Sequence, residues 1–193
     1  MREGDSFSAQ ADRTINLSRG LFRGLSQVQT PQGVLAIGRV PDSTLAGARS
    51  LARERRWPLV VLDGVQDPGN VGAIARTAAA AGAPSLVVLP GTADPYGAKA
   101  VRASAGHIFN LRVVSAAWAE LEGARCLGAA THGTSLEEIE FGAVEAVVFG
   151  SEAHGLSRQL PTVTLPMAPG VESLNVAAAA AILLYEVRRR LAA

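Results

Sequence analysis

The sequence predicts an α/β fold in which a parallel sheet is covered by helices on both faces. Short and almost wholly apolar runs, such as VVLD at 60–63 and VVFG at 147–150, have the pattern of strands that are buried on both sides. Helical patterns separate these runs, and strands that alternate with helices typically form a parallel sheet. At 193 residues the chain has room for one full domain and a small appendage.

The elements are expected in the following order. Residues 1–18 are polar and lack apolar periodicity, so we expect a mobile arm. The stretch LFRGLSQVQTPQGVLAIGRV predicts a short helix and then a strand at 33–40, and a helix follows at 43–55. After Trp57 we expect strands at 59–62, 86–89, 108–114, 125–130, 144–149 and 163–165, and helices near 70–81, 97–104, 116–122 and 174–191.

Composition excludes several classes of protein. The longest uncharged apolar stretch, 176–185, is about half of the roughly 20 residues that a membrane span needs, so we expect a soluble cytoplasmic protein without a membrane segment. The single cysteine, Cys126, excludes an internal disulfide and a cysteine cluster for metal, and its apolar surroundings favour a structural thiol over a nucleophile. The three histidines form no i, i+4 pair, so no metal site is expected.

Charge is unevenly placed along the chain. Residues 1–56 carry nine arginines and five acidic residues, whereas residues 57–193 carry nine basic and twelve acidic residues. A basic end on a mildly acidic domain favours a polyanionic partner on that side. Three arginines, Arg188 to Arg190, close the last helical segment, where they are expected to act as solvated charge that complements the helix terminus.

The first motif, DGVQDPGNVGAIARTAAAAG, carries a strand through a tight turn into a helix at 63–82. Backbone amides at such a helix start can receive a phosphate, and Asn70 and Arg76 could project toward one cleft. Alternatively, Asn70 is a helix cap and Arg76 a surface residue. The turn, with Asp94 further on, also superficially fits a dinucleotide-binding fingerprint, but its glycines read GNVG, and Pro68 sits inside the turn.

The second and third motifs lie close together in the C-terminal part. VVFGSEAHGLS brings a strand to a sharp turn at Gly150 and exposes Glu152 at the edge where parallel sheets bind ligands. TLPMAPGVESLNVA then sets a short strand and a proline-rich turn ahead of a helix, for which Ser173 is a good N-cap. Ser173 and Asn175 can offer hydrogen bonds to a ribose or a phosphate, or they only cap the helix and satisfy the loop.

These three motifs, in this order, resemble the signature blocks of the SpoU family of RNA ribose 2′-O-methyltransferases, in the SPOUT superfamily. The resemblance covers about residues 57–193. It implies a parallel α/β sheet with a deep C-terminal trefoil knot, S-adenosyl-L-methionine as the cofactor, and a homodimer that packs through the knot region. Residues 1–56 then hold an arm, a linker and the remnant of a small RNA-recognition domain, to which GLSQVQTPQGVLAI is similar.

The resemblance also implies roles for individual residues. The expected catalytic residues are Asn70, Arg76, Glu152, Ser173 and Asn175. The expected cofactor-binding residues are Thr131, Gly150, Leu165, Met167 and Leu174. Two positions depart from the family pattern, namely His154, where a small or acidic residue is usual, and Ala177, where serine is frequent.

The implied reaction is methylation of a ribose 2′-hydroxyl in RNA. The TPQG segment favours 23S ribosomal RNA over transfer RNA as the substrate. Three alternatives remain open at this point: a transfer RNA methyltransferase, a knotted RNA-binding module without activity, and a dinucleotide-dependent oxidoreductase.

Overall fold

The computed structural model describes residues 11–26 and 33–191, and these form two compact units, Met1–Pro41 and Asp42–Ala193. The first unit contains one short helix, α1 (Arg19–Leu25), whose N-cap Ser18 accepts a hydrogen bond from the amide of Leu21. The predicted strand at 33–40 is wrong, because these residues pair with no other strand in the described part of the chain. Of the predicted arm, residues 1–10 lie outside the described residues.

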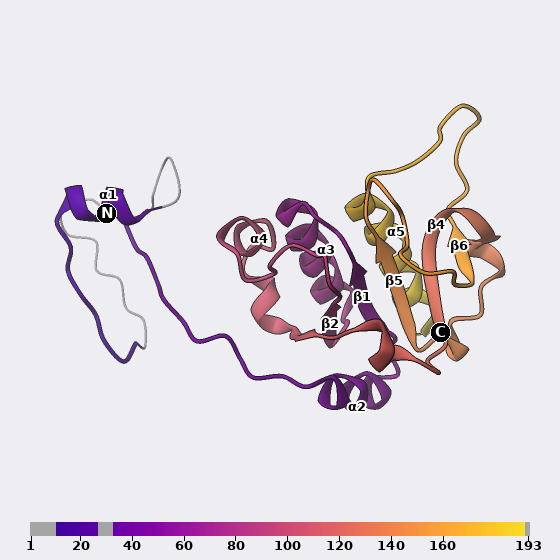
Figure 1. Ribbon diagram of the computed structural model, residues 1–193, viewed down its shortest axis with the longest axis horizontal. Coiled ribbons are helices and arrows are strands. Elements are labelled where there is room, and N and C mark those ends of the chain that lie inside the picture. Colours follow the sequence, from indigo (N-terminus) through magenta and orange to yellow (C-terminus); the bar gives the residue numbers. More distant parts are fainter. Residues whose placement is uncertain (1–10, 27–32, 192–193) are drawn as a thin grey trace. The chain divides into compact units, whose positions relative to one another are not determined.

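The second unit is built on a six-stranded sheet whose pairs are all parallel, as the sequence predicted. The strands lie in the order β3-β2-β1-β5-β4-β6. Figure 1 labels the five strands from β2 to β6 in this order. β1 and β5 are buried at every position, which explains their unbroken apolar sequences. The strand bounds are β1 Leu59–Asp63, β2 Ser85–Val88, β3 Arg112–Ser115, β4 Cys126–Ser135, β5 Ala146–Gly150 and β6 Thr162–Thr164.

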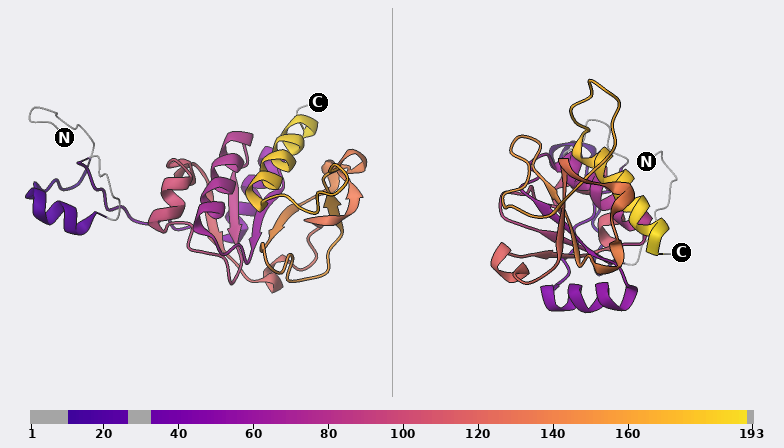
Figure 2. Two further views of the ribbon diagram at one scale, coloured as in Figure 1. Left: turned by 90° about the horizontal axis from the view of Figure 1, so that it is seen from above. Right: turned by 90° about the vertical axis from the view of Figure 1, so that its right-hand side faces the viewer.

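Helices cover both faces of this sheet (Figure 2). On one face, Val60 and Leu62 of β1 share a core with α3 (Pro68–Ala81) and α5 (Val176–Leu191). On the other face, alternate residues of the same strand pack against α2 (Leu45–Arg55). The period-2 alternation of a strand therefore divides the apolar residues between two cores. Helix α2 belongs to the sheet unit, although it precedes the strand at which we predicted the main domain to open.

The shorter elements differ from the predictions where a glycine or a cap stops a helix. α4 (Ala98–Ala103) ends ahead of two residues with positive φ, Ala105 and Gly106, and a 3₁₀ turn, η1 (His107–Asn110), occupies the start of the predicted strand at 108–114. The predicted helix at 116–122 is a single 3₁₀ turn, η2 (Trp118–Leu121). The Glu120 carboxylate caps this turn at the Ala117 amide. Two further 3₁₀ turns, η3 (Leu136–Glu138) and η4 (Phe141–Ala143), follow β4.

Close packing of α3 on α4 depends on Gly72. A Cβ atom at this position would lie 2.2 Å from the carbonyl oxygen of Ala100, a distance that no side chain tolerates. The glycine therefore lets α4 approach the first turns of α3, where Asn70 lies. None of the helices in the described ranges is long and apolar enough to cross a membrane.

Candidate functional site

A cavity of about 700 Å³ opens beside the middle of β4 and at the carboxyl ends of β5 and β6. Strands reach it through Thr131 of β4 and Gly150 of β5, and the turn before α5 closes it. All five residues predicted to bind the cofactor line this cavity: Thr131, Gly150, Leu165, Met167 and Leu174. The structure thus gathers residues from three separate stretches of sequence into one place, and their roles remain predictions.

The end of β5 is shaped by a tight loop. The backbones of Ser151 and Gly155 exchange two hydrogen bonds of 2.9 Å, so the chain turns back on itself immediately after the strand. A Cβ atom on Gly150 would lie 2.4 Å from the carbonyl group of Gly155, so only glycine fits there. The loop projects Glu152 into solvent at the cavity wall.

Three predicted catalytic residues meet beside this cavity. The side-chain amide of Asn70, in the first turn of α3, donates a hydrogen bond to the Glu152 carboxylate. The amide of Asn175 donates in turn to Oδ1 of Asn70, at 3.2 Å. This chain of two hydrogen bonds joins the three sequence motifs, which lie up to 105 residues apart. We refer to Asn70, Glu152 and Asn175 as the polar cluster.

Asn175 also begins the last helix. Its Oδ1 accepts from the amides of Ala177, at 2.9 Å, and Ala178, at 3.3 Å, which are otherwise unsatisfied donors of the first turn of α5. The prediction that Ser173 is the N-cap is therefore wrong. Ser173 lies two residues before the cap, lines the cavity and is exposed. A single asparagine thus serves both the helix and the polar cluster.

Arg76 is not brought into the cavity. It lies on α3, six residues after Asn70, with its side chain exposed. It forms no hydrogen bond or ion pair with any residue that the structure describes, so its guanidinium is available to a partner outside this set. The nearby start of α3 is instead fixed by Asp67, which pairs with Lys99. The hydrogen bond from Lys99 and the amides of Gly69 and Asn70 lower the pKa of Asp67 below its usual value.

Asp63, at the end of β1, is a positioning residue that the sequence reasoning missed. Its carboxylate is buried and accepts from the Ser157 amide at 2.7 Å, the Ser157 hydroxyl at 2.8 Å and Trp118 Nε1 at 3.2 Å. These bonds hold the far end of the loop that carries Glu152 against the neighbouring strand. The signal was present in the sequence as the one charged residue that ends the apolar run VVLD.

Known proteins of one family are similar to this chain in sequence and in fold. The SpoU rRNA Methylase family matches residues 58–185. The chain is 35% identical over 184 residues to the 23S rRNA (guanosine(2553)-2'-O)-methyltransferase RlmP of Bacillus subtilis, covering 89% of this chain and 71% of that protein.

Solved structures agree. The SpoU methyltransferase AviRb of Streptomyces viridochromogenes, in complex with AdoMet, matches at a TM-score of 0.63 and 34% identity over 69% of this chain and 57% of AviRb. A putative RNA methyltransferase of the TrmH family from Porphyromonas gingivalis matches at a TM-score of 0.70 and 34% identity. The match covers 88% of this chain and 71% of that chain. The chain thus spans just over half of AviRb.

The position of the cavity and the comparisons exclude one of the three alternatives. The glycine-rich turn after β1 does not line the cavity, which lies beyond β4, β5 and β6. The position of the cavity and the family match therefore both contradict the alternative of a dinucleotide-dependent oxidoreductase. The chain belongs to the SpoU rRNA methylase family, which confirms the predicted class, an RNA methyltransferase that uses S-adenosylmethionine.

Proposed function

We propose that this protein methylates a ribose 2′-hydroxyl of 23S ribosomal RNA, with transfer RNA as the alternative substrate. The observation that carries the proposal is the polar cluster, which stands beside a cavity lined by every residue predicted to bind the cofactor. The named activity of the Bacillus subtilis relative supports ribosomal RNA. An RNA substrate of this kind also supports a cytoplasmic location.

The cavity suits S-adenosylmethionine in size and charge. Its volume of about 700 Å³ falls in the usual range of roughly 300–1,000 Å³ for small-molecule sites. Among the described residues that line it, none is a lysine or an arginine, and one is a glutamate. A cation is therefore not repelled there. Leu165, Met167 and Leu174 would hold the cofactor, which supplies an activated methyl group on its sulfonium.

The polar cluster and Arg76 are assigned to the RNA side of the reaction. Asn70 is already held by Glu152 and Asn175, so its orientation is fixed before the ribose arrives, and alignment of reactants can lower a barrier by several kcal/mol (roughly 7–11 in the best cases). A guanidinium does not lose its proton at ordinary pH. Arg76 therefore grips a phosphate and stabilises the negative charge that develops on the ribose oxygen.

The finer features of the family are part of the proposal. Residues 57–193 form the methyltransferase domain, with a trefoil knot formed by the chain after β4, and residues 1–56 contain part of an RNA-recognition domain. The likeness to SpoU structures supports the knot. Two large exposed apolar side chains of α5, Ile182 at 47% and Tyr185 at 66% exposed, support a homodimer that packs through this region.

The test begins with calorimetric titration of the purified protein with S-adenosylhomocysteine, using NADH as a control ligand. We expect binding of the first and not of the second. Transfer of a radioactive methyl group to purified bacterial ribosomal RNA, followed by mapping of the modified ribose, then tests the reaction. Binding without transfer to either ribosomal or transfer RNA would favour the inactive RNA-binding module.

Replacement of Arg76 by lysine separates the two roles that this residue could have. We expect the methylation rate to fall by about 10²–10³, the usual effect of losing one positioned donor, with unchanged affinity for S-adenosylhomocysteine. Arg102→Lys is the matched control, since Arg102 is also an exposed helical arginine, on α4. Retention of most activity, with a pH profile that follows the lysine, would mean that residue 76 acts as a base.

A further inference from the structure

A second cavity, of about 640 Å³, lies at the opposite edge of the sheet, where β1, β4 and β5 begin. Leu59 opens β1 there, and Arg125 and Glu145 immediately precede β4 and β5. α2 forms one wall, and the last turn of α5 forms another. β5 runs between the two cavities and is five residues long, so at about 3.3 Å per residue roughly 13 Å of strand separates them.

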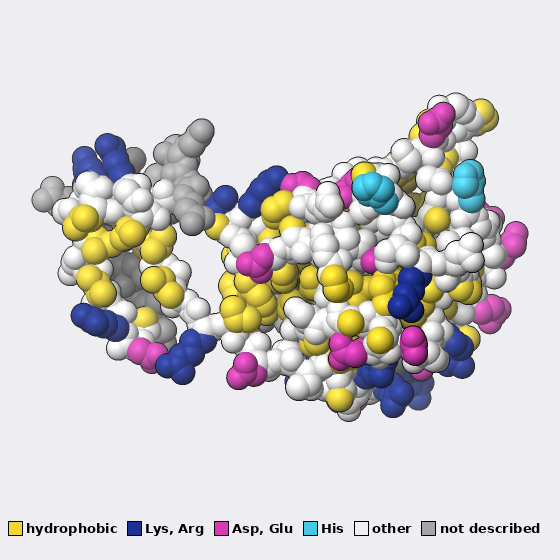
Figure 3. Space-filling view, viewed as in Figure 1, with side chains coloured by type: hydrophobic (Ala, Val, Ile, Leu, Met, Phe, Trp, Pro, Cys, Tyr) yellow, Lys and Arg dark blue, Asp and Glu magenta, His cyan; other side chains and the backbone are white. Residues whose placement is uncertain are grey.

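Arginine dominates the lining of this second cavity. Five arginines and two glutamates line it, whereas no lysine or arginine lines the first cavity among the described residues. Figure 3 shows Lys and Arg side chains gathered along the lower border of the second unit, where Figure 1 places α2. The five are Arg49, Arg53, Arg56, Arg125 and Arg190, and we call this cavity the arginine cavity.

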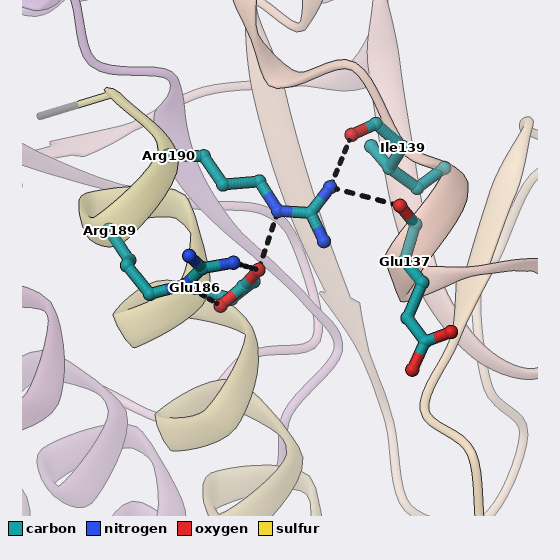
Figure 4. Close-up of polar contacts among 5 residues, drawn as sticks. All are labelled: Glu137, Ile139, Glu186, Arg189 and Arg190. Carbon is teal, nitrogen blue, oxygen red and sulfur yellow. Dashed lines mark hydrogen bonds and ion pairs between the residues drawn. The ribbon is translucent and has the colours of Figure 1, made fainter. Parts of the chain in front are cut away.

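Two of these arginines are fixed within the fold. Arg190 donates to Glu186, to the carbonyl of Glu137 and, at 2.8 Å, to the carbonyl of Ile139, and thereby ties the end of α5 to the turns after β4 (Figure 4). Arg49 donates to the carbonyl of Glu120 at 2.5 Å. Both build the wall of the cavity.

The other three arginines of the cavity have guanidinium groups that can donate hydrogen bonds to a ligand. Arg53 and Arg56 are exposed and form no hydrogen bond through their side chains, and no ion pair, with any residue in the described part of the chain. Arg125 lies 3.8 Å from Glu145, a loose pair with a side chain that is 68% exposed. Arg56 also ends α2 in the left-handed conformation, at φ 52°, which turns the chain into β1 beside the cavity.

The charges in this cavity act on its own carboxylate. The Arg125 amide, which donates to Glu145 at 3.0 Å, lowers the pKa of Glu145 below its usual value, and the charges of Arg125, Arg53 and Arg49 lower it further. Three guanidinium groups, two on α2 and one on the residue before β4, therefore place positive potential at one point. A second anion entering the cavity would experience the same field.

We propose that the arginine cavity binds phosphate groups of the RNA backbone, at the edge of the sheet remote from methyl transfer. The inference rests on the proposed function, since it assumes an RNA substrate. Arginine forks match phosphate oxygens, and several separate guanidinium groups match a backbone that carries phosphates in series. A free nucleotide fits less well, because the two aromatic residues of the lining, Trp57 and Phe141, are 9% and 3% exposed and offer little ring surface for stacking.

The test is the salt dependence of RNA affinity. A fluorescent RNA hairpin is titrated with the full chain at several salt concentrations, and the double variant Arg53→Gln, Arg56→Gln is compared with the wild type. Each lost phosphate contact lowers the slope of log affinity against log salt by about 0.7–0.9, so the double variant should lose about 1.5 from the slope and bind at least about tenfold more weakly. Affinity for S-adenosylhomocysteine should not change, because its cavity is at the other edge.

Two further variants test whether the effect depends on charge inside the cavity. Arg189→Ala removes one positive charge from the last turn of α5 outside the cavity, and it should leave the slope unchanged. Glu145→Gln removes negative charge from the cavity, and it should tighten RNA binding by about twofold, the size of an exposed charge pair.

Failure of the RNA contact and failure of the proposed function give different results. An unchanged slope in the double variant, with intact cofactor binding, would overturn the phosphate-binding role and leave the proposed function standing. Binding of inorganic phosphate by calorimetry, again with an unchanged RNA slope, would show a small-anion site and overturn it equally. A wild-type protein that binds neither S-adenosylhomocysteine nor RNA would remove the proposed function itself.

Discussion

The two edges of the sheet hold cavities of similar volume and opposite character. The cavity at the carboxyl edge, of about 700 Å³, is lined mainly by small and apolar residues, with Glu152 as its charged member. The arginine cavity at the amino edge, of about 640 Å³, holds five arginines. A cofactor that carries a sulfonium favours the first environment, and a phosphate backbone favours the second.

The difference shows how one sheet can separate two kinds of recognition. At the carboxyl edge, strand ends and the proline-rich turn place short side chains around a pocket, and the polar cluster is built from neutral amides and one carboxylate. At the amino edge, long cationic side chains come from a helix that precedes the sheet and from the residue before β4. Cationic residues at both edges would weaken cofactor binding through repulsion.

The largest effect is expected when an arginine is placed in the cavity at the carboxyl edge, which removes the difference in charge between the two cavities. Leu174 lines it and is 41% exposed, so Leu174→Arg should fold normally. We expect affinity for S-adenosylmethionine, whose sulfonium an arginine repels, to fall at least about a hundredfold, or roughly 2.7 kcal/mol, by calorimetry. Val171→Arg is the matched control, because Val171 is 48% exposed in the same turn and does not line the cavity. Equal losses in the two variants would mean that the turn, and not the cavity, was disturbed.

A smaller effect should follow from loosening the carboxyl edge alone. Asp63→Ala removes the acceptor of the Ser157 amide and hydroxyl, whereas Trp118 Nε1 keeps its shorter bond, of 2.8 Å, to Ser157 Oγ. The loss should lower the free energy of unfolding by about 2–4 kcal/mol in urea. Cofactor affinity should fall as well, since Ser157 ends the loop that carries Glu152, whereas the salt slope of RNA binding should persist.

The control for that experiment is Asp94→Ala. The Asp94 side chain is exposed and accepts one hydrogen bond, from the amide of Tyr96, so its loss should cost less than about 1 kcal/mol. A comparable loss of stability in both variants would argue against a special role for Asp63.

The smallest expected effect concerns the amino edge and depends on pH. Hydrogen bonds from Arg189 and then Arg190 lower the pKa of Glu186 from 4.5 to about 2. A carboxylate whose pKa is depressed by folding stabilises the protein above its unfolded value, and this stability is lost as pH falls from 4.5 toward 2. Glu186→Gln should therefore cost on the order of 1 kcal/mol at neutral pH, since the Arg189 side chain is largely exposed, and close to nothing near pH 2. Urea unfolding across that range measures it, and a cost that persists at the acidic end would contradict the assignment.

Much of the sheet could be predicted because its strands carry their own signal. β1, β2 and β5 are buried at every position, and apart from Asp63 and Ser85 at strand ends their sequences have no polar side chain. The run at 33–40 has similar composition and forms no strand, because a strand requires a neighbour for its backbone hydrogen bonds. The pattern of one segment cannot report whether a neighbour exists.

The candidate site was predictable from motifs and not from periodicity. Resemblance to the family singled out Thr131 and Met167, whose shared position at one cavity depends on how separate strands are ordered. Local rules favoured Ser173 as the helix cap, whereas Asn175 caps the helix and also donates a hydrogen bond to Asn70 from another segment. The contacts of Asp63 and the arginine cavity join segments that are distant in sequence, so no local pattern predicted them.

Helix α5 forms part of the wall of both cavities, and this limits how its length can change. Val176, Ala179 and Leu183 face the first cavity, and Arg190 and Leu191 face the second, over 16 residues or about 24 Å. One inserted residue would rotate one end against the other by about 100° and shift it by about 1.5 Å, so that one wall or the other would present the wrong side chains. The length of α5 therefore fixes the distance between the two cavities. We expect insertions to be tolerated in the turn before this helix and not within it.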